Sequence, residues 1–89
     1  MVNLRGTVIT TRFVLENNSA IVSVFKDADG EWQFFGNEEN ISEEDARVIS
    51  LDEILQIDPT LKELLGIDNG SHAYREDDRD NWKVKKYDE

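Results

Sequence analysis

Few side chains in this 89-residue chain are of the kinds that carry out chemistry, and their spacing assembles no catalytic group. His72 is the only histidine. As a general base it would need a nucleophile within reach, and the adjacent Ser71 would point to the opposite face of a strand. We therefore predict that the protein is not an enzyme and has no catalytic residue and no cofactor. An enzyme that pairs His72 with a carboxylate to act on a small substrate is the least favoured alternative.

The spacing of Asp27, Asp29 and Glu31 resembles the start of a calcium-binding loop. A loop of the EF-hand kind needs glycine at position six and glutamate at position twelve. Here glycine falls at position four, as Gly30, and Trp32 occupies position six, although position twelve is a glutamate. An Asp-Gly turn between two strands accounts for the same residues. The sequence therefore predicts no metal site.

Acidic residues outnumber basic ones by 20 to 10, which gives a net charge of -10. Ten of the acids lie between positions 27 and 53, where Arg47 is the only basic residue. Nucleic acids and anionic membranes would repel such a chain, so neither is an expected partner. The acidic block is either a solvated surface that keeps the chain soluble or a docking surface for a basic protein, whose association it would accelerate.

If the acidic block is a docking surface, its acids and the aromatic residues near them form the binding site. The predicted partner-binding residues are Glu38, Glu39, Glu43, Glu44, Asp45, Asp52, Glu53, Phe35 and Tyr74. An exposed aromatic side chain beside the acids would anchor the interface, as buried aromatic residues at protein interfaces often do. Trp32 is instead assigned to the core. The basic residues gather after position 74, where they could pair with the acidic loop or touch a phosphate group.

The apolar pattern predicts three strands in the first part of the chain, over 7–11, 20–25 and 31–35. The first lies in a run rich in β-branched residues that could extend to about residue 15. Asp-Gly in the turn over 27–30 is a strong hairpin signal, so the second and third strands should be antiparallel neighbours. Alternation then places Trp32 and Phe34 on one face and Phe35 on the other.

Two short helices are expected after an acidic loop over 36–45, which ends in a possible helical turn, and a brief strand over 46–49. Ser50 and Glu53 have capping-box spacing, which starts a helix that runs to about residue 57. Asp58 and Pro59 suit the N-cap and the first position of a second helix. That helix covers 60–65 and ends at Gly66, and its buried stripe would be Leu61, Leu64 and Leu65.

Two further strands, over 71–75 and 82–87, complete the pattern. In the last strand Trp82 and Val84 would face inward, while Lys83 and Lys85 face solvent. The order of elements predicts an α+β fold, with a small, mostly antiparallel β-sheet and two short helices packed on one face. The chain is one domain over 1–89, with a core over about 7–87. An all-β half-barrel with helical decoration is the main alternative.

Three stretches together resemble those of small acidic bacterial proteins of unknown function. They are Gly30-Glu-Trp-Gln-Phe-Phe35, Val48-Ile-Ser-Leu-Asp-Glu-Ile-Leu-Gln-Ile-Asp-Pro-Thr-Leu61 and Gly70-Ser-His-Ala-Tyr-Arg75. In that pattern a tryptophan–phenylalanine strand precedes an acidic loop, an Asp-Pro helix and a Gly-x-x-Ala-x-Arg strand. Some relatives are similar to immunity proteins, which neutralise toxins in bacterial competition systems. The resemblance implies a binding protein and carries over no catalytic residue.

The expected state is a monomer or a weak homodimer in the cytoplasm. The first residues lack the apolar stretch of a signal peptide, and no segment approaches the roughly 20 apolar residues that cross a bilayer. A structural or self-associating domain, whose charge only confers solubility, is the alternative to a module that binds a basic protein. In that alternative an exposed edge of the 20–35 hairpin would pair between two copies.

Overall fold

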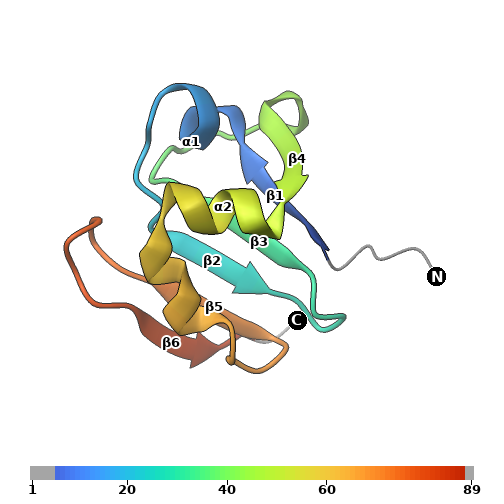
Figure 1. Ribbon diagram of the computed structural model, residues 1–89, viewed down its shortest axis with the longest axis vertical. Coiled ribbons are helices and arrows are strands. Elements are labelled where there is room, and N and C mark those ends of the chain that lie inside the picture. The colour runs from blue at the N-terminus through green and yellow to red at the C-terminus, as the bar shows by residue number, and fades with distance from the viewer. Residues whose placement is uncertain (1–5, 88–89) are drawn as a thin grey trace.

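Six strands form one mixed sheet, and the segment 51–64, which holds an α-helix and a 3₁₀ helix, crosses one of its faces (Figure 1). The structure, a computed structural model, describes residues 6–87. The strands are β1 (Thr7–Thr11), β2 (Ser23–Lys26), β3 (Trp32–Phe35), β4 (Ala46–Ser50), β5 (Ser71–Tyr74) and β6 (Lys83–Lys86). The helices are α1 (Arg12–Glu16) and α2 (Leu51–Ile57), with 3₁₀ helices η2 (Glu43–Asp45) and η3 (Pro59–Leu64). The predicted α+β class is confirmed.

The strands are ordered β4-β1-β3-β2-β5-β6, and only the neighbours β1 and β3 run parallel. The sheet is therefore mostly antiparallel, as predicted. The hairpin of β2 and β3 is also confirmed, with Lys26 opposite Trp32. In its turn the Asp27 carboxylate accepts the backbone N–H groups of Asp29 and Glu31, each at 2.9 Å. Gly30 has a φ of 86°, a left-handed conformation that glycine adopts without steric cost.

The core lies between the sheet and the two helices that cross it. Val24, Phe34 and Ala73 of the sheet pack with Ile54 of α2 and Leu61 of η3, and all five are buried. Both helices begin where the sequence predicted. The Ser50 hydroxyl accepts the N–H of Glu53 at 3.0 Å, and the Asp58 carboxylate accepts the N–H of Thr60 at 3.0 Å. These bonds satisfy N–H groups that a helix leaves without an internal partner.

The suggested extension of the first strand beyond residue 11 is wrong, because the chain turns into α1 at Arg12. The Thr11 hydroxyl accepts the N–H of Val14 at 3.4 Å and so caps this helix. Helix α1 buries Val14 in the core. Here tertiary packing overrides the β preference of a run of β-branched residues.

Two residues predicted to be buried are exposed, for different reasons. Leu65 is 41% exposed because η3 is a 3₁₀ helix, in which residues three apart share a face. Leu61 and Leu64 therefore face the core, while Leu65 does not. Val84 is 47% exposed because β6 is an edge strand whose four residues are all exposed.

The predicted pairing edge on the 20–35 hairpin is also wrong. Strands β2 and β3 lie in the interior of the sheet, and the two edge strands are β4 and β6. At the β4 edge, Arg47 Nη1 donates to the carbonyl oxygens of Glu44 and Ala46, each at 2.8 Å. Basic side chains thus occupy both edges, which disfavours the pairing of one copy with another.

Candidate functional site

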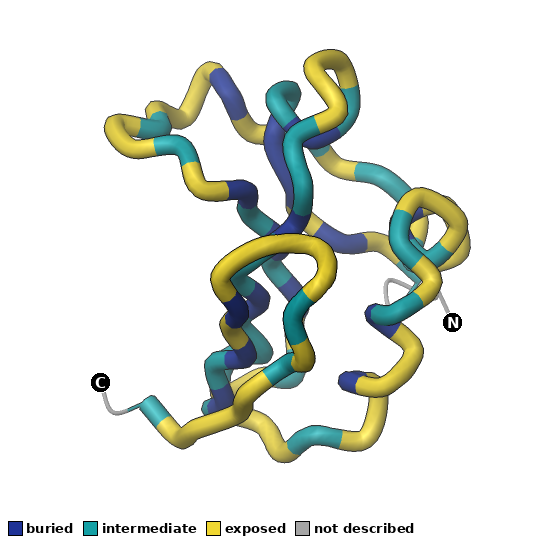
Figure 2. The backbone as a smooth tube through the Cα atoms, turned by 90° about the vertical axis from the view of Figure 1, so that its left-hand side faces the viewer, coloured by how far each residue is buried: buried dark blue, intermediate teal, exposed yellow. Residues whose placement is uncertain are grey.

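Two acidic loops that lie far apart in sequence start at the same end of the sheet and lead to its opposite edges. Strands β3 and β5 both end there, because Phe35 and Tyr74 each pair with Ser23 of the intervening β2. The loops that follow them, 36–45 and 75–82, start about 10 Å apart, since two strand spacings separate them. We call this region the acidic end. Its carboxylates are Glu38, Glu39, Glu43, Glu44, Asp45, Glu76, Asp77, Asp78 and Asp80. Most residues of both loops are exposed (Figure 2).

The structure separates the predicted acids into two groups. Glu38, Glu39, Glu43 and Glu44 belong to the acidic end. Asp52 and Glu53 lie in the first turn of α2, which follows the other end of β4. Since a strand rises about 3.3 Å per residue, the five residues of β4 carry the chain roughly 15 Å between the two groups. The sequence missed the acids of 76–80, which topology adds to the site in place of Asp52 and Glu53.

Asp45 belongs to the acidic loop but is tied into the fold. It is only 8% exposed. It accepts the Ser42 N–H at 3.0 Å and pairs with Arg12 Nε at 2.7 Å. The Ser42 N–H, and after it the Arg12 guanidinium, lower the pKa of Asp45 below its ordinary value of 3.8. Its carboxylate fixes the loop to α1 and is the least accessible of the predicted acids.

Glu38 folds back over the start of its own loop. Its side chain accepts a hydrogen bond from the Ser19 hydroxyl. A Cβ at the buried Gly36 would lie 2.6 Å from Glu38 Oε1 and 3.2 Å from the Ala20 carbonyl oxygen, so a side chain there would displace the end of the Glu38 side chain. Oε1 itself is buried and has no hydrogen-bond partner among the described residues. Glu38 therefore holds the loop against residues 19–20, while Glu39, Glu43 and Glu44 are exposed.

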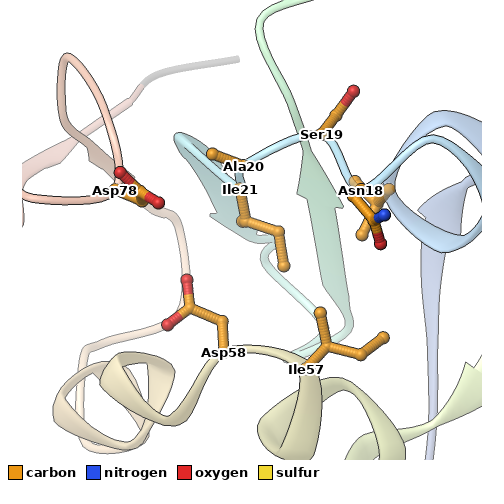
Figure 3. A pocket seen from close by; sticks show the side chains of 8 residues that line it. Asn18, Ser19, Ala20, Ile21, Ile57, Asp58 and Asp78 are labelled. Atoms are coloured by element: carbon orange, nitrogen blue, oxygen red, sulfur yellow. The ribbon is translucent and has the colours of Figure 1, made fainter.

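A hollow of about 330 Å³ opens at this end, between the 17–22 segment, the end of α2 and the 75–82 loop (Figure 3). Ile21 and Ile57 supply apolar walls, and Asp58 and Asp78 supply carboxylates. Figure 3 shows the Asp58 carboxylate directed toward the side of the hollow on which Asp78 lies. Long cationic side chains bury an apolar stem and keep a charged head near polar groups. Asp58 already pairs with Arg75 and accepts from Thr60, so Asp78 is the carboxylate that a lysine or arginine side chain entering the hollow would meet.

One wall of the hollow is held by a buried arginine that the sequence assigned to a basic surface region. Arg75 is 6% exposed, and its Nη2 lies 2.6 Å from Asp58 Oδ2. The guanidinium also donates to the Ile21 carbonyl oxygen from Nε and Nη2, at 3.0 and 2.8 Å. It lies 4.1 Å from the centre of the Trp82 ring. Arg75 is thus a structural residue that fixes Asp58 and Ile21.

The other basic residues of this region do not pair with the 36–45 loop in the structure. Lys86 lies 3.7 Å from Asp68, and both side chains are largely exposed. Lys85 lies 5.4 Å from the centre of the Tyr74 ring. Asp45 of this loop instead forms an ion pair with Arg12 of α1.

Phe35 and Tyr74, the predicted aromatic anchors, lie on the sheet face that the helices leave open. Both pair with Ser23, so they share one row across the sheet next to the acidic end. Phe35 is half-buried against Phe25, with ring centres 6.1 Å apart, and Tyr74 is 36% exposed. Trp32 lies on the opposite face and is buried, as predicted. Each anchor is thus the last residue of its strand, directly before one of the two acidic loops.

His72 has a neighbour that its sequence position did not reveal. Its Nε2 lies 2.8 Å from the Ser23 hydroxyl, across the β2–β5 pair, and its ring stacks on Phe25 at 4.1 Å. Partial burial, and after it the charge of Lys85, lower the pKa of His72 below its ordinary value of 6.5. The described hydrogen bonds include none between the His72 ring and a carboxylate. Ser71 faces the core, as strand alternation predicted.

Within residues 6–87 no group of three His, Cys, Asp or Glu side chains is arranged to hold a metal ion. None of the helices in that part of the chain has the length and apolar character needed to cross a membrane. No family model matches the chain, and searches of curated proteins and of solved structures also find no match.

Proposed function

We propose that this protein is a non-catalytic module that binds a basic protein at its acidic end, as an immunity protein of a bacterial toxin system would. The observation that carries the proposal is that the acidic 36–45 and 75–82 loops start at the same end of the sheet as a hollow that Asp78 of the second loop helps to line. Binding there would occlude the partner's own basic surface.

Two kinds of group would act at different stages of binding. The exposed carboxylates would attract the partner from a distance and raise the association rate. The hollow and the aromatic row would act after contact, because residues that become desolvated at the centre of an interface dominate its affinity. Phe35 and Tyr74 are the aromatic side chains placed for this role. Loss of charge should therefore slow association, and loss of Tyr74 should speed dissociation.

The test is a pull-down at low salt, followed by binding kinetics with the purified protein that is retained. The variant carries Glu39→Lys, Glu43→Lys and Glu44→Lys, all exposed positions of the acidic end. The matched control carries Asp29→Lys, Glu31→Lys and Glu63→Lys, which make the same change in net charge at exposed positions elsewhere. At an ionic strength of about 0.01 M, where the Debye length is about 30 Å, we expect association to slow at least tenfold in the variant.

The control separates a docking surface from charge that only keeps the chain soluble. If the acids act only through net charge, both triple variants will change the association rate equally. If no basic protein is retained from the native cell, or if the two variants behave alike, the proposed function fails.

A further inference from the structure

The sheet has a second surface of opposite charge, along its β6 edge. All four residues of β6 are exposed, and three of them are lysines: Lys83, Lys85 and Lys86. Figure 1 shows β6 at the margin of the sheet, next to β5. The strand therefore combines a run of positive charge with an open backbone edge, in a chain whose net charge is -10.

The register shows which backbone groups of β6 are available. The Tyr87 N–H donates to the Gly70 carbonyl oxygen at 3.0 Å, which continues the β5–β6 ladder beyond Lys86. In an antiparallel ladder, bonded and non-bonded pairs alternate. Lys83 and Lys85 are therefore in the same phase as Tyr87, and their backbone groups face β5. The N–H and C=O groups of Val84 and Lys86 point away from the sheet, where an added strand would meet them.

The side chains beside this edge differ on its two faces. Lys83 pairs with Tyr74 and Lys85 with His72, so both lysines lie on the open face of the sheet. A shallow hollow of about 280 Å³ is bordered by Gly66, Ile67, Asp68, Ser71, Val84, Lys85 and Lys86, and in it Asp68 lies 3.7 Å from Lys86. A strand added to β6 would thus present alternate side chains to two lysines and to a small, partly apolar hollow.

We propose that the β6 edge binds an extended protein segment in which acidic and small apolar residues alternate. The acids would lie opposite Lys83 and Lys85, because opposite charges directly across a strand pair are stabilising. The apolar residues would enter the hollow beside Val84. Backbone hydrogen bonds to Val84 and Lys86 would supply the rest of the binding.

A second copy of β6 fits this edge poorly. Antiparallel pairing centred on Val84 would place Lys83 of one copy opposite Lys85 of the other, and pairing centred on Lys85 would place the two Lys85 side chains opposite each other. Like charges directly across a strand pair are destabilising, and edge lysines are a common protection against such pairing. The same lysines attract an acidic segment once it is close. The net charge of -10 opposes its approach from far away, so the affinity must come from short-range contacts.

The probe is the acetylated and amidated peptide Glu-Val-Glu-Val-Glu, titrated into the full chain at about 0.15 M salt, where the Debye length is about 8 Å. Backbone amide shifts in an NMR spectrum report the site and the dissociation constant. We expect the largest shifts at Val84 and Lys86. We also expect Lys85→Glu to weaken binding at least tenfold, and the matched control Lys62→Glu, at an exposed position on η3, to change it less than twofold.

Two further comparisons test whether the peptide adds as a strand. N-methylation of alternate peptide residues removes the donors that would face β6 and should abolish binding without any change to the protein. Val84→Pro removes an N–H that points away from β5, so the internal ladder of the sheet is retained and binding should be lost.

Several outcomes would overturn the proposal. They are the absence of binding by the peptide, shifts confined to another surface, equal shifts of Val84 and Lys86 on addition of a Lys-Val-Lys-Val-Lys peptide, and unchanged binding after N-methylation. Self-association of the protein alone that Lys85→Glu abolishes would assign the edge to a second copy instead. None of these results bears on the acidic end, so this proposal and the proposed function can fail separately.

Discussion

At the scale of single residues, Arg75 is the side chain whose environment departs most from what the sequence suggested. Its guanidinium contacts the Asp58 carboxylate, the Ile21 carbonyl oxygen and the Thr60 hydroxyl, and it is almost fully buried. One cation thus joins β5 to the start of η3 and to the segment before β2. These are the walls of the hollow, so the shape of the candidate site depends on this residue.

Removal of that guanidinium should be far more costly than removal of a surface arginine. We expect Arg75→Ala to lower the free energy of unfolding by about 3 kcal/mol, because it leaves a partly buried carboxylate and a carbonyl group without their partner. Arg79→Ala, at an exposed position of the neighbouring loop, should change it by less than about 0.5 kcal/mol. Urea unfolding of both variants measures the difference. Equal effects would show that Arg75 does not hold the fold together.

Asp45 should make stability depend on acidity. Its pKa is lowered in the folded state, so the stability it contributes is fully present above the ordinary value of 3.8 and is lost as pH falls through the lower folded value. We expect Asp45→Asn to be less stable than the parent at neutral pH, and the gap to narrow below about pH 4. Unfolding curves across this range measure it, with Asp29→Asn as the exposed control. A gap that stays constant down to pH 2 would contradict this role.

At the scale of elements, η3 shows how helix type selects the core. A 3₁₀ helix repeats every three residues, so Leu61 and Leu64 face the sheet together. An α-helix would have brought Leu65 to the same face as Leu61, as four-residue spacing does. In the structure Leu65 instead borders a hollow with Trp32 and Leu51 at the other end of the sheet.

This difference can be measured with two adjacent leucines. We expect Leu64→Ala, at a position 2% exposed, to lower the free energy of unfolding by about 3 kcal/mol, within the range for buried leucines. Leu65→Ala, at a position 41% exposed, should lower it by less than about 1 kcal/mol. Thermal or denaturant unfolding of the pair provides the comparison. Similar losses would mean that the segment is an α-helix in solution.

At the scale of the whole molecule, charge is sorted by surface. Carboxylates gather on the loops at one end of the sheet, and three lysines line the β6 edge. The open face has no acid within its central row, which the strand registers define. That row is Val48, Ile9, Gln33, Phe25, His72 and Lys85. The net charge of -10 is therefore a sum over surfaces of opposite charge. One binding proposal concerns the acidic end, and the other concerns the basic β6 edge.

The sequence by itself determined the features that depend on near neighbours. The Asp-Gly hairpin, the helix starts at Ser50 and Asp58, and the opposite faces of Trp32 and Phe35 all follow from spacing within a few residues. Local hydrogen bonds and strand alternation act over that range, so each could be predicted without the fold. The α+β class followed from their order.

Only the tertiary structure decided which distant residues meet. Strand order placed the 76–80 acids at the end of the sheet where the 36–45 loop also starts, and it placed Asp52 and Glu53 at the other end. It also paired Ser23 with His72, buried Arg75 against Asp58 and left Val84 at an edge. Each of these depends on the position of a strand in the sheet, which is set by packing of the whole core and leaves no signal in the spacing of neighbouring residues.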